Sequence, residues 1–509
     1  MVMLEVKNYK STLIAAFPLA LMVLLCGCQV GPHYNPPAPT PVTAPNYKES
    51  TVNFHDQEGW KVASPQDAMI RGKWWEIFNE PELNDLEEQL IVNNESIKVS
   101  FENLMAARAV IAQARSQYWP TVTVGPSWNR SRSSSNLRNS SQANTGTTST
   151  LWSLPLDVSW TPDFFGKIRN EVHSAEYAAQ VSAADLELEK LVVQSSLAQY
   201  YFELRGQDML QQILNQTVEV DQKALDVTQG AYDTGVGDYI SVVEAKTTLK
   251  SAQSSAINVG LLRAQYEHAI ATLIGKSASD FSIPVRPMLY TPPSIPTGVP
   301  SQLAERRPDI AAAERTLAEA NATIGIGYGA FFPQVTISAA GGFQSSTFKH
   351  LFDINSRFWS IGPSASQVVF DGGLYRAELH QYEATYNSDL SNYRQTVLTA
   401  FQQVEDALSA MRIYSQQILA QDEAVMAAQQ FLDLEMERYR MGVDPFVTVV
   451  VAQTALLNNQ VELNALHVQE MTTAVQLVQA LGGGWDHSQL PTAKQVGEKV
   501  PASAYTMQK

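Results

Sequence analysis

Two kinds of hydrophobic spacing alternate along the chain, and the longer kind dominates its second half. There, Leu379, Tyr382 and Tyr386 begin an apolar series with steps of three or four residues, and no proline occurs from Leu374 to Asp444. This spacing predicts an uninterrupted helix of about 60 residues, roughly 90 Å long at 1.5 Å per residue. Such a helix does not fit a compact core, so its apolar stripe predicts coiled-coil-like packing against neighbouring helices.

Shorter segments alternate with a period of two, as strands with one apolar face do. In "PQVTISAAGGF", Val335 and Ile337 share one face while Gln334 lies on the other. The segment from Trp152 to Trp160 alternates in the same way and has aromatic ends, which suit a membrane interface. The edge of a soluble β-sandwich is the alternative interpretation.

The chain carries an internal duplication. Three motifs of the first half recur in the same order in the second half, at offsets between 207 and 213 residues. The pairs are "QYWPTVTV" with "AFFPQVTI", "DFFGKIR" with "FDGGLYR", and "GVGDYISVVEAKTTL" with "GVDPFVTVVVAQTAL". These matches indicate that a unit of roughly 200 residues was copied.

Each copy is predicted to contain a helix, two strands, a very long helix and a return helix, a fold class that is mainly α. The copies cover residues 66–282 and 301–485, with a Pro-rich linker over 283–300 and a tail over 486–509. The predicted strands are about 119–129, 151–163, 333–344 and 358–370. The predicted helices are about 82–117, 167–234, 239–275, 308–328, 374–441 and 446–481.

Proline and glycine mark the joints between these elements. Pro120 and Pro333 end the first helix of each copy, where a strand begins. Gly166 and Gly373 lie where the second strand of each copy passes into the very long helix. Proline cannot continue a helix and glycine permits a sharp change of direction, so these four positions are expected to be structural joints.

Four strands per chain cannot close a sheet. An open edge in lipid leaves unpaired backbone groups that cost several kcal/mol each, and small single-chain barrels need about eight strands. The strands are therefore expected to be pooled between copies in a symmetric ring. Two chains would supply eight strands, whose interior side chains fill, whereas three would supply twelve and leave a passage. We favour three, because the long helices need a cylinder wide enough to form a tunnel.

The N-terminus has the features of a lipoprotein export signal. Lys7 and Lys10 precede a short apolar run that ends in "LLCGCQVGPHYNPPAP". Residues 1–27, with Cys26, are predicted to be removed, which leaves Cys28 as a lipidated first residue; a plain signal peptide is the alternative. Residues 28–65 then form a Pro-rich, extended segment. No later stretch has the apolar run of a transmembrane helix, so any membrane crossing must use strands.

Composition and motifs exclude several classes of function. The net charge of −16 argues against a nucleic-acid partner. The eight histidines lack paired ligand spacing and the two cysteines lie near the N-terminus, so no metal site or other cofactor is expected. Within "RRPDI", Pro308 and Asp309 are explained by the start of a helix. No GxSxG motif or other catalytic arrangement is present, so an enzyme is not expected.

Two similar turns, "AYDTGVGDYISVV" and "RYRMGVDPFVTVV", separate the very long helices from the return helices. Gly235 and Gly442 are expected to end the long helices in the left-handed conformation. Asp238 and Asp444 follow at positions that are not strictly equivalent. One hypothesis makes both carboxylates caps of the return helices, with Pro445 in the first helical turn. The other places them in rings of three that select cations, and both hypotheses can hold together.

Several of these segments resemble the TolC-like outer-membrane factor family. They are Leu303 to Phe343, "GCQVGPHYNPP" at the lipidation signal, "FDGGLYRAEL" at a joint, and "RYRMGVDPFVTVVVAQTAL" at the second turn. The resemblance covers nearly all of the mature chain and keeps the order of the family's motifs. The group it resembles most is the NodT-type lipoproteins that serve RND efflux pumps.

This resemblance implies a homotrimer in the Gram-negative outer membrane, with a twelve-stranded barrel that continues into a long periplasmic α-helical tunnel. It also implies a periplasmic adaptor (a membrane fusion protein) and an inner-membrane RND pump as partners, with small molecules such as drugs, toxic compounds or ions as cargo. Tyr232 and Tyr439 match family positions at a closed periplasmic gate, beside Asp238 and Asp444. A type I secretion exit for polypeptides and a non-channel coiled-coil scaffold of the envelope are the alternatives.

The lipidation signal leads to a first prediction. Replacing Cys28 with Ser removes the thiol that would carry the lipid, so metabolic labelling of the protein with palmitate should disappear. The matched variant Cys26→Ser should still be labelled, because Cys26 leaves with the signal. Labelling that persists in Cys28→Ser contradicts the assignment.

Overall fold

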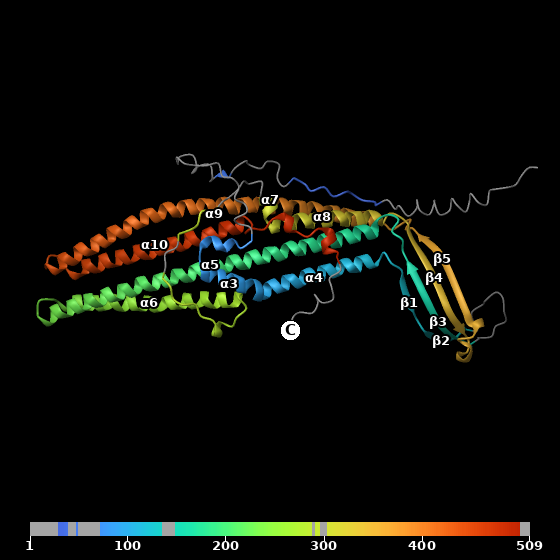
Figure 1. Cartoon of the computed structure of the whole chain (residues 1–509), viewed down its shortest axis with the longest axis horizontal. Coiled ribbons are helices and arrows are strands. Elements are labelled where there is room, and N and C mark those ends of the chain that lie inside the picture. Colours follow the sequence, from blue (N-terminus) through green and yellow to red (C-terminus); the bar gives the residue numbers. More distant parts are fainter. Residues whose placement is uncertain are drawn as a thin grey trace, which may run out of the picture.

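The protein is elongated, with its helices along the long axis, a sheet at one end and two hairpin turns at the other (Figure 1). The computed structural model describes residues 29–38, 47–48, 72–134, 148–287, 291–295 and 303–498. Cys28 and the signal segment 1–27 lie outside the described residues. None of the helices in the described ranges is both long enough and apolar enough to cross a membrane.

Helices make up most of the described chain. The main ones are α3 (Pro81–Asn93), α4 (Glu95–Ser116), α5 (Lys167–Asp233), α6 (Tyr239–Leu273), α8 (Pro308–Gly329), α9 (Leu374–Arg440) and α10 (Phe446–Ala480). Short helices are η2 (Trp74–Phe78), η3 (Ala278–Asp280), α7 (Leu303–Arg306), η5 (Phe348–His350), η6 (Ile354–Ser356), η7 (His487–Gln489) and α11 (Ala493–Val496). The strands are β1 (Thr121–Val124), β2 (Ser127–Arg132), β3 (Thr148–Trp160), β4 (Gln334–Ser345) and β5 (Arg357–Ser366).

The elements of the two copies correspond in length and order. Helices α5 and α9 each have 67 residues, and the return helices α6 and α10 each have 35. A constant offset of 207 residues therefore superposes α5 on α9 and α6 on α10. Within each copy the long helix packs along its return helix, and α5 also packs against α8 and α10 of the other copy.

Each return helix ends against the start of a shorter helix, and one side chain joins the two ends. In the first copy, the Asn94 side chain accepts a hydrogen bond from the amide of Ile97 and donates one to the carbonyl of Leu273, the last residue of α6. Asn94 has an extended backbone, so the helix predicted over 82–117 is two helices, α3 and α4. The prediction of one helix was wrong because asparagine here caps α4 instead of continuing α3.

In the second copy the same position is Arg307. Its guanidinium donates to the carbonyl of Ala480, the last residue of α10, at 2.9 Å, and to Gln403 at 2.8 Å. It also forms an ion pair with Asp309 in the first turn of α8, at 2.7 Å. Helix α8 begins at Pro308, so the structural interpretation of "RRPDI" is confirmed, and Arg307 adds a link between two stacked helices that the interpretation had missed.

The largest apolar cluster lies at this mid-height level. Trp74 and Phe78 of η2 pack with Leu83 of α3, Phe202 of α5 and Val475 of α10. The cluster thus joins both copies around the place where the return helices end. Burial of these large side chains supplies the main apolar stabilisation of the described chain.

The sheet is antiparallel, in the order β1-β3-β4-β5, with β2 also paired to β3. The pairing of β3 with β4 joins the two copies, while β5 at one edge and β1 with β2 at the other have no further partner in the described chain. The strand predicted over 119–129 is interrupted in the structure. Gly125 donates to the carbonyl of Pro155 at 3.4 Å, and Pro155 has no N–H to return the bond.

Two predicted strands end earlier than expected. The prediction extended one strand to residue 163 and the other to residue 370, but β3 ends at Trp160 and β5 at Ser366. The residues that follow form the joints to the long helices, where Asp163 and Asp371 accept hydrogen bonds from backbone amides. Local capping therefore replaced strand pairing at both ends.

The connecting segments pack on the helices wherever the structure describes them. Tyr47, from the segment predicted as an extended tether, is buried with Leu303 and Leu477. The start of the inter-repeat linker is held by buried charges: Arg205 donates to the carbonyl of Pro284 and Arg263 to that of Ile283, both at 2.7 Å. These contacts bind the linker to the helical body.

The Arg307 contacts generate a stability prediction. Arg307→Ala removes a buried, charge-assisted link between α8 and α10, so the free energy of unfolding should fall by about 1.5–3 kcal/mol. Arg440→Ala is the control, because Arg440 forms only an exposed ion pair with Glu437 and its removal should change stability little. Denaturant unfolding followed by circular dichroism measures both, and an equally small effect of the two variants contradicts the role of Arg307.

Candidate functional site: the hairpin turns and the strand–helix joints

The two hairpin turns form one end of the molecule, which we call the turn end: residues 233–239 between α5 and α6, and residues 440–446 between α9 and α10 (Figure 1). Gly235 and Gly442 both have a φ of +74°, the left-handed conformation expected from the sequence. Their amides donate to the carbonyls of Tyr232 and Tyr439, each at 2.9 Å. These bonds close the C-termini of α5 and α9.

Asp238 caps the first return helix, as one hypothesis expected. It is the N-cap residue of α6, and its carboxylate accepts a hydrogen bond from the amide of Ser241 at 2.7 Å. This hydrogen bond lowers the pKa of Asp238 below its usual value. The carboxylate is exposed and stays ionised near neutral pH, so the residue is both a cap and a fixed negative charge.

Asp444 does not cap the second return helix, and that part of the capping hypothesis is wrong. The N-cap residue of α10 is Pro445, which has no side chain able to accept a bond, and the helix begins at Phe446. The offset of 207 residues makes Pro445, not Asp444, the counterpart of Asp238. The Asp444 carboxylate instead forms an ion pair with Arg438, which lowers the pKa of Asp444.

An aromatic pair stands at each turn. The rings of Tyr232 and Tyr239 are 5.4 Å apart, and those of Tyr439 and Phe446 are 5.3 Å apart. Phe446 is only 2% exposed whereas its counterpart Tyr239 is 62% exposed, so the second turn packs against the rest of the protein and the first one faces outward.

The two turns are close enough to interact electrostatically. Burial raises the pKa of Tyr439, and the negative charge of Asp238 raises it further. Below the turns, Ala224 of α5 and Ala245 of α6 pack with Val449 and Ala452 of α10. The structure therefore brings Asp238 and Tyr439 together, although they lie 201 residues apart in the sequence (439 − 238).

At the opposite end, two joints carry the strands into the long helices. Gly166 and Gly373 are the N-cap residues of α5 and α9, with φ values of +77° and +95°. Pro120 and Pro333 directly precede β1 and β4. Each of the four predicted joint residues thus lies at a change from helix to strand or from strand to helix.

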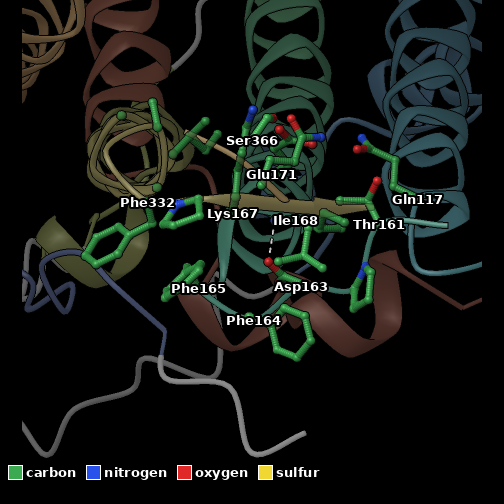
Figure 2. A pocket seen from close by; sticks show the side chains of 18 of the residues that line it. Gln117, Thr161, Asp163, Phe164, Phe165, Lys167, Ile168, Glu171, Phe332 and Ser366 are labelled. Atoms are coloured by element: carbon green, nitrogen blue, oxygen red, sulfur yellow. Dashed lines mark hydrogen bonds between the residues drawn. The ribbon is translucent and has the colours of Figure 1, made fainter. Parts of the chain in front are cut away.

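A cavity of about 520 Å³ opens between these joints (Figure 2). Its lining combines the rings of Phe164, Phe165 and Phe332 with Lys167 and Glu171 from the start of α5. The rings of Phe165 and Phe332 stack 4.7 Å apart and join the end of the first copy to the start of the second strand pair. Aromatic rings with charged neighbours give this level the character of a membrane–water interface.

The N-terminal segment is held at the same joint. The amide of Val30 donates to the carbonyl of Phe165 at 3.1 Å, and the side chain of Asn170 donates to the carbonyl of Val30 at 3.1 Å. A Cβ on Gly166 would lie 2.8 Å from the Cα of Gln29, so only glycine allows the segment to approach this closely. Gln29, the residue after Cys28, is therefore fixed beside the strand–helix joint.

Sequence reasoning missed several residues of these sites. Arg438 was not singled out, because an ion pair six residues away across a turn leaves no periodic signal. Asp163 and Asp371 could have been found, since an aspartate two or three residues before the glycine at a helix start is a capping signal.

The described residues contain no cluster of three or more His, Cys, Asp or Glu side chains that could hold a metal ion. The turn end instead offers fixed charges and aromatic rings, and the joint offers an aromatic cavity. Such groups can close, line or position a passage, and they provide no nucleophile with an adjacent base.

Comparisons with known proteins agree with this geometry. The family model described as "Outer membrane efflux protein" matches residues 86–276 and 299–483, one match for each copy. The antibiotic efflux pump outer membrane protein ArpC of Pseudomonas putida is 29% identical over 464 residues, which cover 91% of this chain and 94% of ArpC. The toluene efflux pump outer membrane protein TtgC, from the same species, shares the same identity and coverage.

A solved structure has the same fold. The outer-membrane channel OprN matches with a TM-score of 0.81 at 27% identity, over 90% of this chain and all of that chain. The match covers helices and strands together.

The Asp238 cap generates a prediction that separates its two properties. Asp238→Ala removes the cap, so hydrogen exchange at the Ser241 amide should become faster, whereas Asp238→Asn keeps a capping oxygen and should leave exchange almost unchanged. The pKa of Asp238 is lowered in the fold, so wild-type protection should be complete above the unfolded value of about 3.9 and should fall as the pH drops through the folded value. Unchanged exchange in Asp238→Ala contradicts the cap.

Proposed function

The chain belongs to the outer membrane efflux protein family, and from this membership we propose that it forms the outer-membrane exit duct of a tripartite RND-type efflux system. Its cargo is small molecules such as drugs, toxic compounds or ions, which a periplasmic adaptor and an inner-membrane pump deliver to it. Relatives named as antibiotic and toluene efflux components support this class of cargo. The family is one of membrane channels and not of enzymes.

The observation that carries the proposal is the pair of unpaired sheet edges at one end of very long helices. Strands β1 and β2 share one register against β3 and act as a single strand, so each chain supplies four. Three chains close these edges into a twelve-stranded barrel, wide enough to leave a passage that continues between the helices. An open edge in lipid would instead leave its backbone groups unpaired.

The outer surface of the sheet supports placement in the outer membrane. Val122 and Val124 of β1, Trp128 of β2, and Trp359 and Ile361 of β5 are large apolar residues exposed in the single chain. Exposed apolar side chains on strands suit contact with lipid, and tryptophans suit its borders.

Lipid anchoring at Cys28 fits the same arrangement. Gln29 and Val30 are held at the strand–helix joint, level with the aromatic cavity. A lipid carried by the preceding residue would therefore start at the periplasmic border of the membrane and could insert there without stretching the chain.

The turn end is the proposed periplasmic gate. Around a threefold axis, Asp238, Asp444, Tyr232 and Tyr439 each occur three times. The ion pair with Arg438 neutralises Asp444 in this state, so Asp238 supplies the unpaired negative charge of the constriction. Carboxylate rings favour cations, and the tyrosine rings narrow the passage.

Planar-bilayer recordings of the reconstituted protein test this function. Tyr439→Ala and Asp444→Ala should both raise single-channel conductance, because each removes a contact that holds the second turn. Asp444→Ala should also lower the preference for cations, since it leaves Arg438 as an unpaired positive charge. The matched control Arg438→Ala should shift the preference the opposite way.

Two results would count against the proposal. Absence of channels in wild-type protein would contradict the exit duct itself. Conductance and selectivity that stay the same in all three variants would remove the gate assignment while leaving the duct in place.

A further inference from the structure

The two lateral sides of the chain expose apolar residues that nothing in the described protein covers. Helices α6 and α9 run along opposite borders of the molecule, with α5 and α10 between them (Figure 1). On α6, Ile257 is 79% exposed and Leu261 is 59% exposed; on α9, Ile413 is 49% exposed. Ile257 and Leu261 are four residues apart and therefore lie on one face of their helix.

The contact between the two copies inside the chain shows what such positions do. On α5, Gly206 lies against α10, where a Cβ on Gly206 would be 2.3 Å from Cγ2 and 3.5 Å from Cβ of Val468. The carbonyl of Gly206 accepts a hydrogen bond from the buried side chain of Asn464 at 3.1 Å. Gly206 thus fits between Asn464 and Val468, which are again four residues apart.

The duplication maps this contact onto the three exposed residues. With the offset of 207 residues, Gly206 corresponds to Ile413, while Asn464 and Val468 correspond to Ile257 and Leu261. The contact made inside one chain by α5 and α10 therefore has a counterpart that α9 and α6 could make, but these two helices face away from each other. Only α6 of a second copy can meet α9.

We propose that Ile413 of one copy packs between Ile257 and Leu261 of the next copy, forming a mid-tunnel contact between subunits. This inference rests on the proposed ring of identical chains and assigns it a specific side-chain contact. A second copy is the occupant because one chain carries both halves of the contact, at matching heights on opposite sides. The contact is heterologous, so it repeats around a closed ring.

The inside and outside contacts differ in chemistry. The first combines a glycine with an asparagine, which brings α5 and α10 close and satisfies a backbone carbonyl. The second combines three branched apolar side chains, which hold α9 and the neighbouring α6 farther apart. The ring then alternates three close and three wider contacts, and the mismatch prevents two identical faces from pairing.

Cysteine cross-linking of the full-length protein in membranes tests the contact. The variant Leu261→Cys/Ile413→Cys should form disulfides between copies, because the equivalent Cβ atoms inside the chain fall within the distance a disulfide spans. A non-reducing gel should show a shift to the mass of two and three chains. Each single variant, which keeps the native cysteines, should run as one chain, and so should the matched pair Gly206→Cys/Val468→Cys, which links only within a chain.

A charge exchange provides a second, independent arm. Ile257→Lys and Ile413→Glu should each reduce the share of multi-chain assembly seen by size-exclusion chromatography, and the double variant should restore it. Val92→Lys, which alters an exposed apolar residue of α3, should leave assembly unchanged. Losses that add in the double variant would overturn the inference.

These outcomes separate the contact from the proposed function. If wild-type protein forms conducting channels and assembles, but folded Leu261→Cys/Ile413→Cys yields only single chains, the contact is wrong and the duct stands. If wild-type protein neither assembles nor conducts, the proposed function fails first.

Discussion

The rest of the structure depends on one constraint: a sheet edge and a helix flank at the junction between copies must be covered, and one chain can cover only one of two such junctions. Inside the chain, β3 pairs with β4 and α5 packs on α8 and α10, which completes the first junction. The equivalent edge of β5 and flank of α9 are left open, as are β1, β2 and the outer side of α6. A ring of copies covers both sets at once, so the duplication itself explains the need for assembly.

Length is controlled by two capped joints. Asn94 and Arg307 are counterparts at the starts of α4 and α8, and each donates to the last carbonyl of the return helix below it. A return helix and a shorter helix thereby make one column beside each very long helix, without a break that exposes unsatisfied carbonyls. At the other end the two turns differ, because Asp238 caps its helix while Asp444 pairs with Arg438. The first copy therefore offers free charge and the second offers packing, which suits one turn for selectivity and the other for closure.

Periodicity predicted the long elements well and the local exceptions poorly. A stretch without proline and with one apolar stripe predicted a helix over 374–441, and α9 covers Leu374–Arg440. The break at Asn94 could not be read from the pattern, because asparagine is tolerated inside helices and the cap depends on contact with α6. The interruption between β1 and β2 depends on Pro155 in another strand, and the partner of Asp444 lies across a turn. These features follow from tertiary contacts that sequence spacing does not encode.

The central claim is that one chain is one third of a closed duct. Native mass spectrometry of the processed, full-length protein released from membranes in detergent tests it most directly. The account predicts a single dominant assembly with three times the mass of one lipidated chain. A dominant species of one or two chains under conditions that preserve the fold contradicts it, because the open edge of β5 and the exposed flank of α9 would then have no partner.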